Sequence, residues 1–136
     1  MRAPLLALPL LALVASPAAA IEPVVGRWLT DTRDGIIEIG RCGDALCGRL
    51  VKSLVPIAPP GTDTNNPDPA LRGRPILGLP VLTGFKRDGE KWAGQAYDPK
   101  VGKRYSTTLE RIGANALKVR GCVAIFCRTV TWTRAR

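Results

Sequence analysis

After residue 20 the chain alternates apolar and polar residues at a period of two, and no stretch sustains the helical period of 3.6 residues. Segments of this kind, separated by turn-forming pairs such as Asp88-Gly89, are typical of β-strands. The pattern predicts strands at residues 24–32, 36–41, 47–55, 79–87, 90–98, 103–112, 115–121 and 126–134. We therefore expect an all-β fold, a small eight-stranded antiparallel up-and-down barrel, because eight strands are enough to close a sheet around its own side chains.

The register of two predicted strands can be checked against the turn between them. If residues 99–102 close a hairpin, Ala96 faces Tyr105, Gly94 faces Thr107 and Trp92 faces Leu109, which gives one mostly apolar face. This register makes Trp92 and Tyr105 candidates for the inner wall of a ligand cavity. The alternative is that both rings only fill the barrel.

The stretch 56–80 is rich in proline, which removes backbone donors and fixes φ, so it is predicted to be a long loop outside the sheet. It also contains apolar side chains that could dock, and we expect an ordered flap over the barrel. The docking residues would be Leu71, Ile76, Leu77 and Leu79.

Few residues in the chain suit catalysis. The sequence contains no histidine, so the usual general base and the commonest metal ligand are both missing. Asp63 and Asp68 in the loop form the one evident carboxylate pair, and the run 63–68 has some of the character of a calcium loop without its glycine and distant glutamate. Asx residues beside proline are ordinary turn and cap formers. We therefore expect no catalytic residue, no metal and no cofactor, and a protein that is not an enzyme.

The amino terminus predicts export. Arg2 is followed by an apolar run, residues 3–14, and by small residues at Ala18 and Ala20 that suit signal peptidase. The run is shorter than the roughly 20 residues that span a bilayer. We expect a signal peptide at 1–20 and a single barrel domain at 21–136, located in the periplasm or secreted.

Four cysteines occur in two pairs with the same spacing. In the predicted strand order the two pairs lie at opposite ends of the barrel, which favours local disulfides in an oxidising compartment. The ligand spacing and the absence of histidine make a zinc site the weaker alternative. The expected bridges are Cys42–Cys47 and Cys122–Cys127.

The charge favours acidic partners. The sequence has 20 Lys and Arg against 11 Asp and Glu, and Arg2 is the one charged residue before the predicted cleavage site, which leaves a net charge of +8. The cations are scattered and no nucleic-acid motif is present, so we expect no nucleic-acid partner. We also expect a monomer. Anionic envelope lipid or an acidic protein remains a candidate partner for a surface made of Arg72 and Arg74, with Lys100 and Arg128 at the same end.

Lys52 has two possible orientations. A regular hairpin through 42–47 would place Lys52 opposite Ile37 and point it inward near the barrel mouth, where an anionic ligand headgroup could meet it. A β-bulge would turn it outward.

Two resemblances add to this interpretation. Gly26-Arg27-Trp28 resembles the glycine-any-tryptophan signature of lipocalins and related calycin barrels, in which the tryptophan plugs the closed end beneath a basic side chain of the last strand. Arg134 is placed to supply that side chain by a cation–π contact. The expected plug is therefore Gly26, Trp28 and Arg134.

The second resemblance covers nearly the whole chain after residue 20. The segments GRWLT, CGDALCGRLV, TDTNNPDPALRGRPILGLPVLTGF, YDPKVGKRYS, LKVRG and TWTR are similar to the secreted bacterial family filed as domain of unknown function 2147, DUF2147. The resemblance implies an exported calycin-like barrel and no reaction. We expect a module that binds a small apolar or amphipathic ligand, an anionic one if Lys52 points inward; the alternative is an envelope surface-interaction protein.

Overall fold

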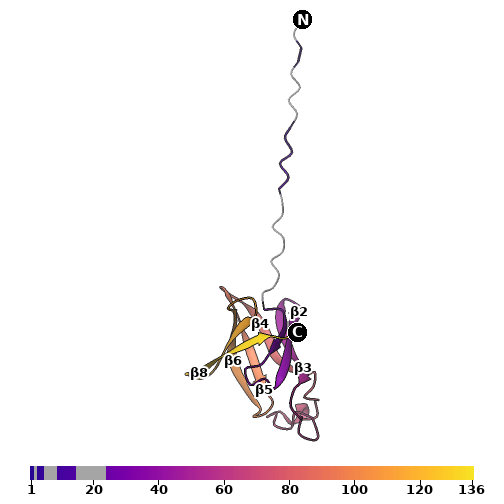
Figure 1. Cartoon of the computed structure of the whole chain (residues 1–136), viewed down its shortest axis with the longest axis vertical. Helices are drawn as coiled ribbons and strands as arrows, with labels where there is room; N and C mark the ends of the chain where they lie inside the picture. The colour runs from indigo at the N-terminus through magenta and orange to yellow at the C-terminus, as the bar shows by residue number, and fades with distance from the viewer. Residues whose placement is uncertain (2, 5–8, 15–23) are drawn as a thin grey trace.

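The computed structural model describes residues 1, 3–4, 9–14 and 24–136, and the predicted signal-peptidase site at residues 18–21 lies outside them. The fold is a closed barrel in which each strand pairs antiparallel with its neighbour in sequence and β1 meets β8 (Figure 1). This confirms the predicted all-β, eight-stranded up-and-down barrel. The strands are β1 Gly26–Leu29, β2 Gly35–Cys42, β3 Ala45–Ser53, β4 Pro80–Asp88, β5 Lys91–Asp98, β6 Lys103–Arg111, β7 Ala116–Val123 and β8 Phe126–Arg134.

The register of β5 and β6 agrees with the sequence prediction. Trp92 pairs with Leu109, Gly94 with Thr107 and Ala96 with Tyr105. The turn at 99–102 and the alternation of apolar residues constrain the same register, which is why the sequence was sufficient here.

The register of β2 and β3 differs from a regular hairpin. Ile37 pairs with Leu50 instead of Lys52, and Lys52 pairs with Ile36, because the register shifts between Ile36 and Ile37. The shift is a bulge, which adds a residue to one strand and turns the following side chain to the other face. Lys52 is exposed on the outer surface, which is the outward orientation expected from a β-bulge and not the inward orientation expected from a regular hairpin.

β1 is shorter than predicted and ends at Leu29 instead of residue 32. Thr30 begins a turn, and its backbone N–H donates to the Gly35 carbonyl at 3.1 Å. As a result, β1 meets β8 only through Trp28 opposite Arg134 and Leu29 opposite Thr133. Among the described residues, the edge of β8 that faces β1 has no strand partner from 126 to 132. The seam between β1 and β8 is therefore closed at one end of the barrel and open toward the other.

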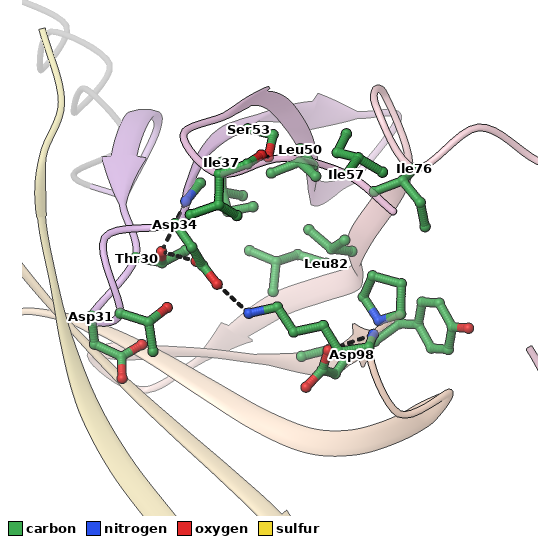
Figure 2. A pocket seen from close by; sticks show the side chains of 18 of the residues that line it. Thr30, Asp31, Asp34, Ile37, Leu50, Ser53, Ile57, Ile76, Leu82 and Asp98 are labelled. Atoms are coloured by element: carbon green, nitrogen blue, oxygen red, sulfur yellow. Dashed lines mark hydrogen bonds and ion pairs between the residues drawn. The ribbon is translucent and has the colours of Figure 1, made fainter. Parts of the chain in front are cut away.

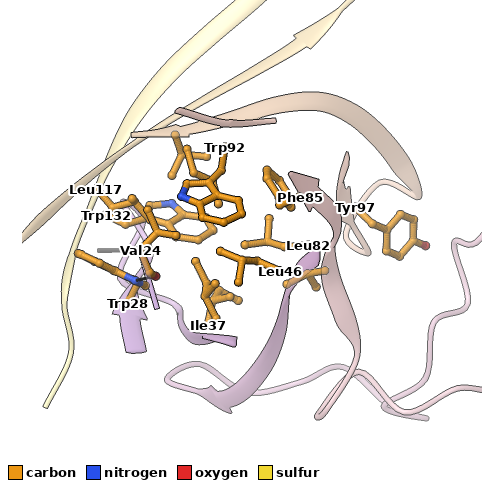
Figure 3. Close-up of a cluster of buried hydrophobic side chains, with 14 of the residues drawn as sticks. Val24, Trp28, Ile37, Leu46, Leu82, Phe85, Trp92, Tyr97, Leu117 and Trp132 are labelled. Atoms are coloured by element: carbon orange, nitrogen blue, oxygen red, sulfur yellow. Dashed lines mark hydrogen bonds between the residues drawn. The ribbon is translucent and has the colours of Figure 1, made fainter. Parts of the chain in front are cut away.

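The closed end of the barrel is filled by large side chains (Figure 3). Trp28 is fully buried and donates its indole N–H to the Val24 carbonyl at 2.9 Å. Trp92 is 4% exposed and packs in this core, so it fills the barrel and does not line the cavity described below. The other large buried side chains here include Phe85, Leu109, Leu117 and Trp132.

Arg134 covers Trp28 from outside. Its guanidinium carbon lies 4.0 Å from the centroid of the indole ring, and its Nη1 donates to the Val25 carbonyl at 3.0 Å. A Cβ at Gly26 would lie 2.3 Å from that Nη1, and the Gly26 φ is +127°. Gly26 is therefore favoured by its backbone conformation, and a larger residue would also displace the Arg134 guanidinium.

The two disulfides join Cys42 to Cys47 and Cys122 to Cys127, which confirms the predicted local pairing. Each closes a hairpin, the first between β2 and β3 and the second between β7 and β8. No helix in the described part of the chain is long and apolar enough to cross a membrane.

Candidate ligand-binding cavity

A cavity of about 670 Å³ occupies the open end of the barrel. Its walls come from β2 to β8, and its rim comes from the 30–35 turn, the start of the long loop and the 98–100 turn. The volume lies in the range of sites for small molecules. The apolar lining includes Ile37, Leu50, Ile57, Ile76, Val81, Leu82, Ala96, Tyr105, Val119, Val130 and Trp132 (Figure 2 labels several of them).

Small residues on β5, β6 and β7 leave this space open. Ala96, Thr107 and Gly121 lie on the cavity wall where larger side chains would fill it. A Cβ at Gly121 would meet Tyr105 and Thr107 only at ordinary contact distances of 3.5 and 3.7 Å. Gly94 is different, because a Cβ there would lie 2.7 Å from the Phe85 ring. Gly94 therefore serves the packed core, and the cavity begins above it.

An ion pair links two turns across the mouth of the cavity. The Lys100 ammonium donates to an Asp34 carboxylate oxygen, and the Thr30 hydroxyl donates to the other at 2.8 Å (Figure 2). Burial alone would raise the pKa of Asp34, but hydrogen bonds from Lys100, Thr30 and Thr32 outweigh it and lower that pKa to about 2. The same hydrogen bond raises the pKa of Lys100, with smaller contributions from the Asp98 and Asp31 charges.

The mouth is therefore not a simple cationic site. Asp31, Asp34 and Asp98 all line it, and Lys100 already has a carboxylate partner. Arg128 also lines the cavity, whereas Lys52 does not. The predicted role of Lys52 as the partner of an anionic headgroup has no support in this geometry.

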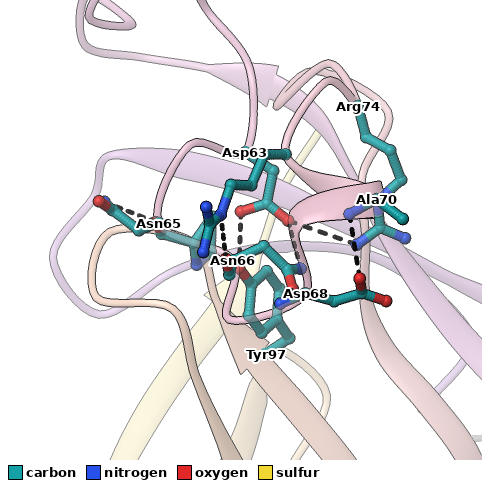
Figure 4. A network of polar contacts seen from close by, with 9 residues as sticks. Asp63, Asn65, Asn66, Asp68, Ala70, Arg74 and Tyr97 are labelled. Atoms are coloured by element: carbon teal, nitrogen blue, oxygen red, sulfur yellow. Dashed lines mark hydrogen bonds and ion pairs between the residues drawn. The ribbon is translucent and has the colours of Figure 1, made fainter.

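The long loop is anchored to the barrel by a buried carboxylate, Asp63 (Figure 4). Asp63 is 0% exposed and accepts hydrogen bonds from the Tyr97 hydroxyl at 2.6 Å, Asn66 Nδ2 at 2.8 Å and Arg74 Nη2 at 3.3 Å. Burial opposes the charge, but these three donors lower the pKa of Asp63 below its usual value. Burial and the hydrogen bond to Asp63 in turn raise the pKa of Tyr97 to about 12.

A second anchor joins the loop to the β5–β6 turn. Asn65 Nδ2 donates to the carbonyls of Pro99 and Lys100 at 3.2 and 2.9 Å. The backbone is so close here that a Cβ at Gly102 would lie 1.9 Å from the Asn65 carbonyl oxygen. Gly102 also has φ +66°, a conformation that favours glycine. The backbone conformation and the close contact with Asn65 therefore both favour a residue without a side chain in this turn.

The apolar residues of the loop divide into docked and exposed ones. Leu79 is 2% exposed, and Ile76 packs against the core, as expected for a docked flap. Leu71 is half-buried. Leu77 is 54% exposed, so the prediction that it docks is wrong. Gly78 N–H donates to the Leu50 carbonyl at 2.7 Å with φ +87°, and this turn sends Leu77 to solvent while Leu79 enters the core.

The charged residues of the loop interact mainly with the loop itself. Arg72 Nε donates to the Asn66 carbonyl at 2.8 Å, and Arg74 pairs with Asp63. Asp68 accepts from the Ala70 N–H at 3.0 Å and so caps the short helix Pro69–Leu71. Asp63 and Asp68 thus have structural partners, and the described residues hold no group of His, Cys, Asp and Glu arranged for a metal. The role of Tyr97 was missed, because only the folded chain brings it to Asp63.

Comparison with known proteins places the chain in a family. The family model described as "Uncharacterized protein conserved in bacteria (DUF2147)" matches residues 26–134, the whole barrel. The chain belongs to DUF2147. Its fold resembles that of a solved structure described as "Protein HP1028 from the human pathogen Helicobacter pylori belongs to the lipocalin family". The TM-score is 0.72, with 19% sequence identity and coverage of 82% of each chain, and this likeness concerns the fold. No curated protein matches the chain.

Proposed function

We propose that this DUF2147 protein is a non-enzymatic binding module that holds one small apolar or amphipathic molecule in the barrel cavity. The observation that supports the proposal is the cavity of about 670 Å³ with predominantly apolar walls and a polar rim. Burying apolar ligand surface there would stabilise the complex by roughly 25 cal/mol for each Å² removed from water.

The rim determines which ligands fit. Thr30, Ser53, Thr64 and Asn65 stand around the mouth and can bond a polar headgroup, while the walls below offer aliphatic and aromatic contacts. Because the Asp34 carboxylate already neutralises Lys100, the geometry favours an uncharged polar headgroup over a strongly anionic one.

The cavity can be tested by filling it. We would measure binding of N-phenyl-1-naphthylamine, an apolar fluorescent probe, to residues 21–136 with both disulfides formed. Gly121→Phe should weaken binding by about tenfold or more, because the new ring occupies the space beside Tyr105. Gly40→Phe is the matched control: Gly40 also lies in a strand, has no atom within 4 Å of its Cβ position and does not line the cavity.

Unchanged probe affinity in a folded Gly121→Phe protein would refute the carrier proposal. Native mass spectrometry of the protein purified from its own envelope provides a second test, since a tightly held ligand would travel with it and should be displaced by the same substitution.

Export is part of the proposal. We infer that the protein acts in the periplasm or outside the cell, on the strength of the signal segment and two disulfides. We also propose that it acts as a monomer. A mature protein whose first residue by mass spectrometry is not near Ile21 would contradict the inferred cleavage.

In the alternative function, an envelope surface-interaction protein, Arg72 and Arg74 would contact the partner, but both already have partners within the loop. Arg72 is bonded to the loop backbone and Arg74 to Asp63. A different surface, the apolar tip of the β7–β8 hairpin, supports a lipid contact.

A further inference from the structure

The β7–β8 hairpin ends in an apolar tip that the rest of the protein leaves uncovered. Val123, Ile125 and Phe126 are 46%, 87% and 78% exposed, and the intervening Ala124 turns the chain with φ +53°. The Cys122–Cys127 disulfide closes the hairpin directly behind them. Contiguous large apolar side chains held in water are unusual in soluble proteins and mark interaction sites.

The tip lies at the open end of the barrel and continues the cavity wall. Alternate residues of a strand share a face, so Phe126 lies on the same side of β8 as the cavity residues Arg128, Val130 and Trp132. The β8 edge beside them is unpaired among the described residues. A molecule at the tip would therefore be next to the mouth and to the open seam between β1 and β8.

The strands around the tip are basic. Within β6, β7 and β8 the one carboxylate is Glu110, which lies at the other end of β6 and pairs with Lys91 and Lys118. The carboxylates of the mouth lie on neighbouring segments, with Asp98 opposite Lys103 in the register and Asp34 paired with Lys100. Ser106 pairs with Cys122, so the start of β6 runs beside the tip. The flanking cations on β6, β7 and β8 are Lys103, Arg104, Arg120 and Arg128.

An apolar tip among cations matches one kind of partner. Lipid phosphates attract the cations, while the acyl boundary beneath them accepts the apolar side chains. An acidic protein would offer carboxylates to the cations but no apolar environment for the Ile125 and Phe126 side chains. A second copy would bring the same cations together, which opposes association.

We propose that residues 123–126, the hairpin tip, insert into the interfacial region of an anionic bilayer while the flanking cations contact lipid phosphates. The proposal does not depend on the carrier function, because the inserted residues 123–126 do not line the cavity. If both hold, docking brings the cavity mouth to the membrane, where an amphipathic ligand can exchange without crossing water.

Vesicle flotation tests the docking. The oxidised protein, residues 21–136, would be mixed with vesicles of phosphatidylglycerol and phosphatidylcholine in equal parts, or with phosphatidylcholine alone. Wild type should float with the anionic vesicles at low salt and bind phosphatidylcholine at least about tenfold more weakly. Ile125→Ser with Phe126→Ser should reduce binding to the anionic vesicles by about tenfold or more, because two large side chains lose their burial in the interface.

A matched pair of exposed apolar residues away from the tip provides the control. Leu77 and Ile112 are 54% and 47% exposed, and changing both to Ser should leave flotation unchanged. Phe126→Trp adds a direct readout, since emission above that of the three native tryptophans should shift to the blue on anionic vesicles, whereas Ile112→Trp should not respond.

Three outcomes would overturn the proposal. The first is equal flotation of wild type and the Ile125→Ser, Phe126→Ser variant. The second is equal loss of flotation in the Leu77→Ser, Ile112→Ser control. The third is a wild-type dimer, by sedimentation, that the tip substitutions convert to a monomer while neither protein floats. Binding of N-phenyl-1-naphthylamine should be unaffected by the tip variant, so failure of this proposal is distinguishable from failure of the carrier function.

Discussion

At the closed end the barrel interior is filled by Trp28, Trp92 and Phe85, whereas at the open end Ala96, Thr107 and Gly121 border empty space. Glycine shows the contrast most directly. Gly26 and Gly94 lie where a Cβ would collide with Arg134 and Phe85, while a Cβ at Gly121 would make only ordinary contacts. One end of the barrel is therefore a packed plug, and the other is a cavity whose walls can accept added volume.

The two ends also differ in what closes them. The closed end is covered by cations over an aromatic ring, because the guanidinium carbons of Arg134 and Arg111 lie 4.0 and 5.6 Å from the centroid of the Trp28 ring. The open end is bordered by a loop that is fixed by hydrogen bonds at Asp63 and Asn65, together with the Asp34–Lys100 ion pair. Apolar packing should therefore dominate stability at the first end, and polar contacts should set the shape of the second.

The largest expected effect is at the plug. Trp28→Ala should lower the free energy of unfolding by about 3 kcal/mol or more, because a fully buried indole and its hydrogen bond to Val24 are lost. Arg134→Ala should cost only about 1 kcal/mol, the size of a cation–π contact. Denaturant titration measures both, and a Trp28→Ala protein within about 0.5 kcal/mol of wild type would contradict the plug.

The next effect separates loop docking from backbone strain. Gly102 and Gly89 have nearly the same φ, +66° and +62°, but only Gly102 is against another segment, the Asn65 backbone. Gly89→Ala should cost about 1 kcal/mol for the left-handed conformation alone. Gly102→Ala should cost about 1 to 2 kcal/mol more, since Asn65 must move away.

Limited proteolysis checks where the Gly102 effect acts. Cleavage within residues 56–79 should accelerate in Gly102→Ala and stay at the wild-type rate in Gly89→Ala. Equal destabilisation and equal cleavage in the two variants would show that the loop is not held by this turn.

The sequence was informative where local signals agreed, and silent where the contact is between distant segments. The β5–β6 register followed from a turn and an alternation that both point to Trp92 opposite Leu109. Alternation also showed that Trp92 points inward, but not how deep it lies, so its place in the core and not on the cavity wall could not be predicted. The bulge at Ile36 and Ile37, which turns Lys52 outward, leaves no comparable signal.

The candidate site was predicted in outline only. A lid over one end of a barrel was expected from residues 56–80. However, an aspartate such as Asp63 in a proline-rich loop is as typical of a turn former as of an anchor to the barrel. Its partner Tyr97 is 34 positions away, and the pairing exists only because the loop folds back onto β5. For the same reason Arg72 and Arg74 could be identified as charged loop residues but not as partners of Asn66 and Asp63.

A smaller effect is expected at the Asp63 anchor. Tyr97→Phe should cost about 1 to 3 kcal/mol, because it removes a donor from a buried carboxylate. The lowered pKa of Asp63 means that its contribution is present above the ordinary value near 3.8 and is lost as the pH falls through the folded-state pKa. The raised pKa of Tyr97 means that its contribution is lost as the pH rises from 10 toward about 12.

Unfolding titrations across pH test this anchor. Wild type should lose stability above pH 10 through Tyr97, and Tyr97→Phe should lose less over the same interval because it has no phenol there to ionise. Identical alkaline profiles for the two proteins would show that the Tyr97 hydroxyl does not hold the loop.

The smallest effect on stability belongs to the ion pair at the mouth, although its effect on Asp34 should be clear. The Lys100 side chain is 65% exposed, so Lys100→Ala should change the free energy of unfolding by less than about 1 kcal/mol. The pKa of Asp34, held at about 2, should nevertheless rise in the variant, since Lys100 supplies its largest favourable hydrogen bond. Asp34 contributes to stability above the ordinary pKa value of 3.8, and this contribution disappears as the pH falls toward 2. In the Lys100→Ala variant, the stabilisation that Asp34 still provides should disappear at a higher pH than in wild type.

Carboxyl-carbon NMR titration of Asp34 in the two proteins measures the shift, with Asp44→Asn as a control far from the mouth. An Asp34 titration that does not move in Lys100→Ala would show that the two turns are not linked across the cavity, and that the open end is held by the loop anchors alone.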